Sequence, residues 1–401
     1  MKTQLMPRLL SLLSLLSALL LQQPAMAALY TPAHDQEIVQ ELPNRLPASA
    51  RAQRQELARR PQQLSLALAT AQAAIGRARS HGDPRELGVA EAALAPWWGQ
   101  ENAPPQVRLL RASVRQSQHD FAGSLRDLDR LLAQASQLPL QVQAQAGLIR
   151  ASVLQVTGQL AMARQACESL TEARFASLGA ALALPAQACL AELRSLSGEP
   201  KQAAAELATL AKQSPDDAWL SLLRAELAQR MGDSVSAGSR YREALAASSG
   251  GDIYTRGAYA DYLLEQGRPA EALRVVEGAD AESDALLLRR AIALKRLASP
   301  LLPAIVASLT ARFEAARLRG ENYHAREEAR LALEVMGQTQ PALQLALRNW
   351  AHQKEPADAL LLQRAALAAG QPAVAAQELQ GLARAGWVDV RWAANLPGRQ
   401  P

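Results

Sequence analysis

The sequence has few of the residues from which metal, redox and nucleotide sites are built. Its 401 residues include two cysteines and five histidines, and these form no CxxC, HxxxH or HExxH motif that would indicate a zinc or thiol redox site. The motifs GxSxG, GxxxxGK[S/T] and GxGxxG, which are typical of hydrolases, P-loop proteins and dinucleotide-binding proteins, are also missing. We therefore expect a protein that is not an enzyme and that uses neither a metal nor a cofactor.

Aromatic residues and strand-like patterns are equally scarce. Hydrophobic residues make up 49% of the chain and aromatic residues only 4%, so the apolar mass is alanine and leucine, which favour helices. Alternating runs of Val, Ile and Thr are lacking, which predicts an all-α fold. The formal charge of +5 comes without a basic run or an aromatic ladder, so nucleic-acid binding is not expected.

The N-terminal segment has the pattern of a secretory signal peptide. Lys2 and Arg8 precede the apolar stretch Leu9–Leu21, which is too short to span a membrane comfortably. A small-x-small sequence ends at Ala27, where we expect cleavage and export to the periplasm of a bacterium. The alternative is an uncleaved anchor. Charged or polar residues interrupt every later apolar stretch, so the mature chain is not expected to insert stably into a membrane.

The segment from Gly251 to Asp280 predicts two short helices joined by a tight turn. Gly267 can end the first helix because a residue without Cβ readily adopts the left-handed conformation. Pro269 suits the first turn of the second helix, where a missing N–H costs nothing. Because about thirty residues cannot bury the apolar face of such a hairpin, we expect similar hairpins beside it.

The same pattern recurs along the chain and resembles the tetratricopeptide repeat (TPR) family. That family has a glycine in the turn between its two helices and small residues where the helices touch. Successive turn glycines are 34 residues apart from Gly198 to Gly232 and 35 apart from Gly232 to Gly267, close to the period of about 34 residues. The matching residues include Gly158, Ala163, Gly198, Ala203, Gly232, Ala237, Ala260, Gly267, Ala272, Gly370 and Ala375.

This resemblance implies a right-handed superhelical solenoid of about nine TPR-like hairpins over residues 61–385. A lead-in with a short helix is expected over 28–60, and a tail with Trp387 and Trp392 over 386–401, where it can cover the last repeat. The hairpins are expected at about 62–80/84–95, 105–117/121–135, 140–156/159–174, 180–196/199–213, 216–231/234–248, 252–266/269–278, 284–298/303–319, 321–336/338–352 and 356–369/371–385.

An arginine followed by alanine recurs in the first helices of the hairpins. In TPR arrays these helices line the concave face, so the arginines could form a ladder for carboxylates. The alternative is that they pack between helices and pair with nearby acids. The ladder predicts that replacing Arg111, Arg150 and Arg224 together weakens partner binding and leaves stability unchanged. Its members are Arg111, Arg150, Arg224, Arg290 and Arg364.

Aromatic residues gather in the fifth and sixth hairpins, where Tyr254 is a candidate for the edge of a peptide-binding groove. The alternative is that this group forms the core of the repeats. Its members are Trp219, Tyr241, Tyr254, Tyr259 and Tyr262.

The two cysteines, Cys167 and Cys189, fall on consecutive predicted helices that run antiparallel. A disulfide is plausible in an oxidising periplasm and, by closing a 22-residue separation, would stabilise the fold by about 3 kcal/mol in the chain-entropy model. The alternative is a pair of buried thiols.

Together these patterns indicate a binding protein. The resemblance implies a non-enzymatic scaffold or adaptor of the bacterial cell envelope, whose concave groove holds an extended peptide or a helix of another protein. The alternative is an accessory protein of polysaccharide or cell-wall metabolism that binds glycan or its enzymes. Aligned, exposed aromatic rings on the concave wall would favour glycan, and a wall of Arg, Gln and Ser would favour an acidic peptide.

Overall fold

The computed structural model describes residues 48–248, 252–278, 283–320 and 324–393, together with His34 and Gln36. The contacts divide the chain into Met1–Arg45 and Leu46–Pro401, and the fold described below belongs to the second unit. The predicted signal peptide and the end of the tail, residues 394–401, lie outside the described residues. In the part of the chain described, no helix combines the length and the apolar character needed to cross a membrane.

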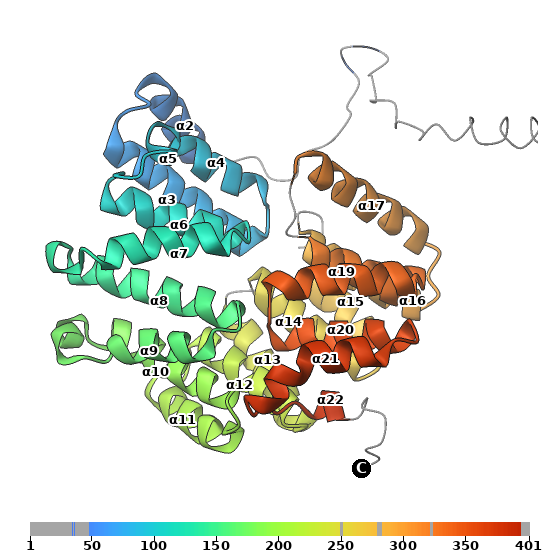
Figure 1. Ribbon diagram of the computed structural model, residues 1–401. Coiled ribbons are helices and arrows are strands. Elements are labelled where there is room, and N and C mark those ends of the chain that lie inside the picture. Colours follow the sequence, from blue (N-terminus) through green and yellow to red (C-terminus); the bar gives the residue numbers. More distant parts are fainter. Residues whose placement is uncertain are drawn as a thin grey trace, which may run out of the picture. The chain divides into compact units, whose positions relative to one another are not determined.

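The described residues form nine helical hairpins and contain no β-strand, which confirms the predicted all-α solenoid (Figure 1). The first helices are α3 (Leu64–His81), α6 (Pro105–Ser117), α8 (Leu140–Val156), α10 (Ala180–Ser195), α12 (Ala218–Arg230), α14 (Ile253–Glu265), α16 (Asp284–Arg296), α18 (Ala325–Arg330) and α20 (Pro356–Ala368). The second helices are α4 (Arg85–Ala93), α7 (Phe121–Leu132), α9 (Leu160–Ser169), α11 (Pro200–Gln213), α13 (Ser234–Ala247), α15 (Pro269–Val276), α17 (Leu302–Leu318), α19 (Thr339–His352) and α21 (Pro372–Arg384).

Short elements lie between and beside the hairpins. The helix α2 (Ala48–Arg59) packs on α3, and its Arg54 bonds both carboxylate oxygens of Glu86 at 2.8 Å. The predicted boundary at residue 60 therefore falls inside the larger unit. The remaining short elements are α5 (Ala95–Trp98), η1 (Ala135–Gln137), η2 (Ala173–Leu178), the π-helix η3 (Leu331–Met336) and α22 (Val390–Ala393).

The helix expected over 159–174 is shorter in the structure. It ends at Ser169, and η2 follows after a break. The hydroxyls of Ser169 and Thr171 bond back to the carbonyls of Ala166 and Glu168 at 2.8 and 2.7 Å. Such local side-chain bonds compete with the helical ladder and favour its termination.

The turns within the hairpins use a left-handed residue, as the sequence predicts. Gly232 and Gly267 have φ of 81° and 70°, a region that glycine enters without steric cost. In the second and seventh hairpins, which lack a turn glycine, His119 and Ala298 take this place with φ of 60° and 50°. The turn is therefore a property of the repeat and does not depend on glycine at every position.

Small residues allow the paired helices to pack closely. Ala237 of α13, Ala260 of α14 and Ala272 of α15 are at most 1% exposed. Their small side chains let the backbones of adjacent helices approach closely. Tyr241, Tyr259 and Tyr262 stack with centroid separations of 5.3–6.2 Å inside the same core. These three rings therefore belong to the repeat core.

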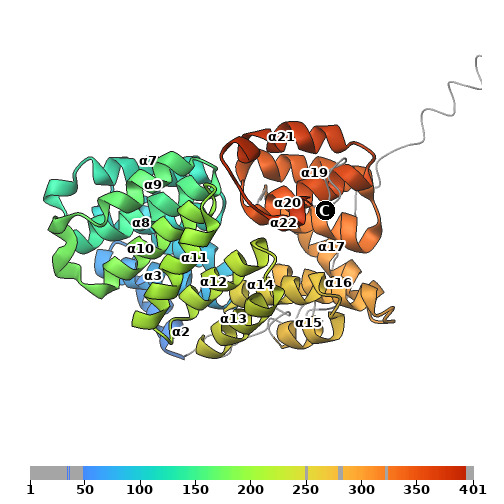
Figure 2. The ribbon, with the colours of Figure 1, turned by 90° about the horizontal axis from the view of Figure 1, so that it is seen from below.

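Segments far apart in the sequence meet within Leu46–Pro401. The N–H of Lys354, between α19 and α20, donates to the carbonyl of Val156 at the end of α8, at 2.7 Å. The backbone at Gly386 lies so close to Gly198 that an added Cβ at Gly386 would stand 3.2 Å from the Gly198 Cα. The last hairpins thus touch the turns of the third and fourth (Figure 2).

Candidate functional site

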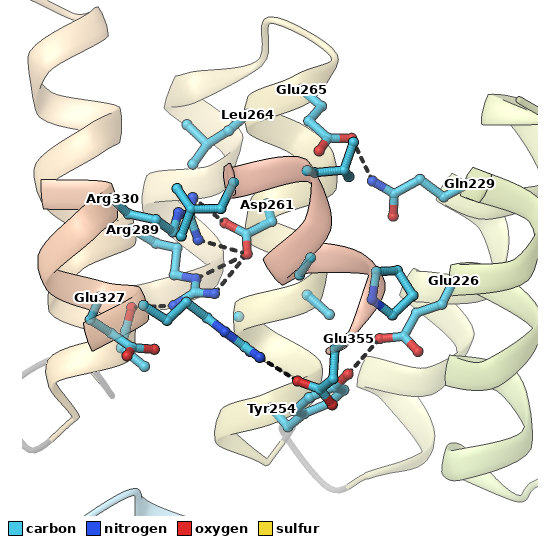
Figure 3. Close-up of a pocket in the computed structure, with 18 of the residues that line it drawn as sticks. Glu226, Gln229, Tyr254, Asp261, Leu264, Glu265, Arg289, Glu327, Arg330 and Glu355 are labelled. Carbon is cyan, nitrogen blue, oxygen red and sulfur yellow. Dashed lines mark hydrogen bonds and ion pairs between the residues drawn. The ribbon is translucent and has the colours of Figure 1, made fainter. Parts of the chain in front are cut away.

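A cavity of about 390 Å³ lies among the first helices of the hairpins (Figure 3). Residues of α3, α8, α10, α12, α14, α16, α18 and α20 contribute to its wall. Because first helices face inward in every one of these hairpins, their equivalent positions converge on one space. The open groove that the resemblance implies is thus, in this protein, a cavity bounded by contacts between distant hairpins.

Three acidic side chains occupy equivalent places on consecutive first helices. Glu192, Glu226 and Asp261 each stand six residues before the turn glycine of their hairpin, and all three line the cavity. Repeats of nearly equal length superimpose these positions along the solenoid. This row of acids was not predicted, although their fixed distance to the turn glycine can be read from the sequence.

Of these three acids, Asp261 is the one that arginines neutralise. Arg289 of α16 approaches it at 2.7 Å and Arg330 of α18 at 2.9 Å. Burial on its own would raise the pKa of Asp261, but the two guanidiniums outweigh burial and lower it to about 2. This ion-pair group joins α14, α16 and α18 across the cavity wall (Figure 3).

A π-helix positions Arg330 for this contact. Arg330 is the last residue of α18 and is followed by η3, which ends at Gly337. A π-turn holds one residue more than an α-turn. Arg330 accordingly stands seven residues before its turn glycine, Gly337, whereas Glu192, Glu226 and Asp261 stand six residues before the turn glycines of their hairpins. The arginine thereby takes the inward position that a carboxylate has in the earlier repeats.

Three further arginines of the wall, Arg326, Arg364 and Arg391, also form ion pairs. Arg326 bonds Asp358 at 2.6 and 2.8 Å and also pairs with Glu355. Arg364 and Arg391 approach Glu265 at 3.4 and 3.3 Å. These lining guanidiniums are therefore matched by carboxylates of the protein itself.

Glu192 and Glu226 differ because neither forms an ion pair with any described residue. Neutral donors bond them instead: Gln155 reaches Glu192 at 2.8 Å, and the Tyr254 hydroxyl donates to Glu226 at 2.9 Å. Burial, followed by repulsion from Glu192, raises the pKa of Glu226 to about 7, and burial also raises the pKa of Glu192. This part of the wall therefore holds carboxylates whose charge the protein leaves without a partner cation.

Replacing Glu226 with glutamine is expected to stabilise the protein above pH 7. The folded pKa of about 7 lies above the unfolded value, so the native state holds an extra proton between about pH 4.3 and 7 and loses stability as pH rises through this window. Glutamine does not titrate and can still accept the Tyr254 bond. Urea titrations should show a gain of about 1–3 kcal/mol at pH 8 and equality with the parent near pH 4. Equal stability at pH 8 would contradict the assignment.

The structure corrects the predicted arginine ladder. Arg111 is only 3% exposed, bonds Asp127 at 2.5 and 2.8 Å and donates to the carbonyl of Trp98 at 2.6 Å. It is a core residue and cannot contact a partner. Arg150 pairs with Asp129 at 2.7 Å away from the cavity.

The remaining predicted residues divide between the cavity and other surfaces. Arg224 and Arg290 are not among the residues of the cavity wall, whereas Arg364 and Tyr254 are. Glu226, two residues after Arg224, lines the cavity on α12, and Arg289, next to Arg290, lines it on α16. The Arg-Ala pattern therefore does not mark the inward-facing position of each helix. Trp219 is 40% exposed and lies outside the cavity wall.

The two cysteines are joined in the structure. A disulfide links Cys167 of α9 to Cys189 of α10, with the Cα atoms 6.2 Å apart. It connects the third hairpin to the fourth outside the cavity wall. Among the described residues, no group of three His, Cys, Asp or Glu side chains is placed to hold a metal ion.

The architecture is a TPR-like α-solenoid. Comparison with protein-family models and with curated proteins gave no match. Among solved structures, a similar chain occurs in the APC/C hetero-tetramer Cut9-Hcn1, with a TM-score of 0.45 and 12% identity over 83% of this chain and 58% of that chain. A tetratricopeptide repeat protein from Parabacteroides merdae gives a TM-score of 0.37 and 13% identity over 74% of this chain and 98% of that chain. The human IFIT1 dimer with m7Gppp-AAAA gives a TM-score of 0.41 and 15% identity over 78% of this chain and 76% of that chain.

Proposed function

We propose that this protein is a non-enzymatic scaffold or adaptor, exported to the periplasm, that binds a segment of a partner protein in the cavity. The observation that carries the proposal is the convergence of eight first helices on one accessible space. Tyr254 is 58% exposed and Ala357 is also exposed, although both line that space. The N-terminal sequence supports export and a role in the cell envelope.

The size of the cavity suits side chains inserted by a partner. A volume of about 390 Å³ lies in the range of sites that enclose small ligands or a few side chains. The bound segment, an extended peptide or a helix, therefore inserts one or two side chains into this space.

Site-specific photo-crosslinking in a Gram-negative host tests this proposal. A benzoylphenylalanine at Ala357 would face the cavity, and one at Ala304 serves as the control. Both alanines are exposed and lie near the start of a helix, but Ala304 of α17 is not part of the wall. We expect a discrete protein adduct from position 357 and none from position 304.

The composition of the adduct separates the alternatives. A peptide crosslinked to residue 357, identified by mass spectrometry, supports binding of a partner segment. A glycan adduct without protein would overturn the proposal in favour of the polysaccharide accessory. Adducts of equal yield from both positions, or none from either, would show that the cavity is not the binding site.

A further inference from the structure

The charges of the cavity wall are unevenly matched. On the α16–α20 side, the arginines that approach Asp261, Glu265 and Asp358 are all held in ion pairs. On the α10–α12 side, Glu192 and Glu226 have no cation within ion-pair distance in the part of the chain described. The protein thus neutralises the lining arginines of the α16–α20 side with its own carboxylates and leaves this carboxylate pair without an ion pair.

The cation that acts on both carboxylates, Arg230, is bonded elsewhere. Arg230 of α12 is 7% exposed and its Nη2 donates to the Ser195 hydroxyl at 2.8 Å. It attracts both carboxylates, yet burial still keeps the pKa of each above its ordinary value. An inserted cation would remove this penalty, since an opposite charge favours the ionised carboxylate.

Tyr254 provides an independent observation at the same place. It belongs to the first turn of α14 and is 58% exposed within the cavity, although large aromatic rings are usually buried. Its hydroxyl donates to Glu226 at 2.9 Å (Figure 3). An accessible ring beside carboxylates is a favourable surface for an ammonium or guanidinium group.

We propose that Glu192, Glu226 and Tyr254 form a subsite for a basic side chain, lysine or arginine, of the segment that the cavity binds. The proposal rests on the function proposed above and names the chemistry of its ligand. The two carboxylates accept the N–H groups of the inserted side chain, and the Tyr254 ring covers its charge. This preference is the reverse of the acidic peptide that an arginine ladder would select.

Short blocked peptides measure the preference directly. The probes are N-acetylated, C-amidated Gly-Arg-Gly and Gly-citrulline-Gly, which differ in charge and hardly in shape, titrated into the mature chain by calorimetry at pH 8. We expect the arginine peptide to bind at least tenfold more tightly. Glu192→Gln and Glu226→Gln should each raise its Kd about tenfold or more, because charge-assisted hydrogen bonds are lost.

Matched variants exclude a structural explanation. Glu243→Gln removes an exposed carboxylate of α13 that pairs with Arg240 and should leave the Kd unchanged. Glu226→Gln is expected to be more stable than the parent at pH 8, so weaker binding cannot result from unfolding. Equal binding of the citrulline peptide, or an unchanged Kd in both glutamine variants, would overturn the proposal.

Two further probes test the sign of the charge and its source. Arg79 of α3 lines the cavity without an ion pair to any described residue, so it could favour an acidic ligand. Blocked Gly-Glu-Gly is therefore the acidic counter-probe. If it binds more tightly than the arginine peptide, the proposal is overturned. Spermidine represents a free cation, and a preference for spermidine over the arginine peptide would contradict a peptide ligand. Crosslinking at residue 357 without any charge preference would refute the subsite alone, whereas charge-selective binding without crosslinking would refute the partner segment alone.

Discussion

Replacing Arg111 with alanine is expected to lower the free energy of unfolding by about 3–5 kcal/mol. The guanidinium is 3% exposed and holds Asp127, which is also buried, at 2.5 Å. It also donates to the backbone carbonyls of Trp97, Trp98 and Gln100, at 3.2, 2.6 and 3.1 Å. Alanine would leave the three carbonyls without this donor and would leave the buried Asp127 with Arg115 as its one remaining cation, at 2.7 Å. Equilibrium unfolding in urea measures the loss.

Arg150→Ala is the matched control because it removes another arginine of the same Arg-Ala pattern. Arg150 pairs with Asp129, whose side chain is 56% exposed, and such pairs contribute about 0–1 kcal/mol. The ladder hypothesis requires both variants to be as stable as the parent. A small effect of Arg111→Ala would therefore contradict its assignment to the core.

Asp358→Ala is expected to cost about 3–5 kcal/mol as well. The carboxylate is 1% exposed, bonds Arg326 of α18 at 2.6 and 2.8 Å and accepts from Asn349 of α19 at 2.6 Å. It also accepts from the Glu355 N–H at 2.9 Å and so completes the capping box of α20. Its removal would leave the Arg326 charge with Glu355 alone and would weaken the joint between three helices.

Asp358 both caps α20 and forms a buried ion pair, so the two contributions to stability must be measured apart. Asp217 caps α12 by accepting from the N–H of Leu220 at 2.9 Å, and it forms no ion pair with any described residue. Asp217→Ala should cost about 1 kcal/mol, the usual value of a helix cap. If thermal unfolding shows similar losses for both variants, the contribution of Asp358 is that of a cap, and the network across α18, α19 and α20 is not stabilising.

The hairpins could be predicted from the sequence because their signals are local. The turn at Gly267 and the small residues Ala260 and Ala272 lie within one repeat, and each acts through steric rules that hold without distant partners. The one-residue insertion at η3 could not be read in this way, since a π-turn changes the direction of side chains without breaking the apolar pattern.

The cavity depends on pairs that are distant in sequence. Asp261 meets Arg330 across 69 residues, and Glu265 meets Arg391 across 126, so no window of one repeat contains both partners. The Arg-Ala pattern failed for a different reason: a shift of one position on a helix turns a side chain by about 100°. Arg289 faces the cavity, whereas its neighbour Arg290 is not part of the wall.

The bond between Lys354 and Val156, and the close approach of Gly386 to Gly198, change how the array can unfold. In a linear solenoid each repeat touches only its neighbours, so terminal repeats can fray independently. Here the loss of the last hairpin also removes contacts from the third and fourth, which couples the unfolding of the C-terminal end to that of these earlier hairpins. The same contacts raise the mean sequence separation of the fold, which slows folding, and the approach of Gly386 to Gly198 forms only after the chain is synthesised beyond Gly386.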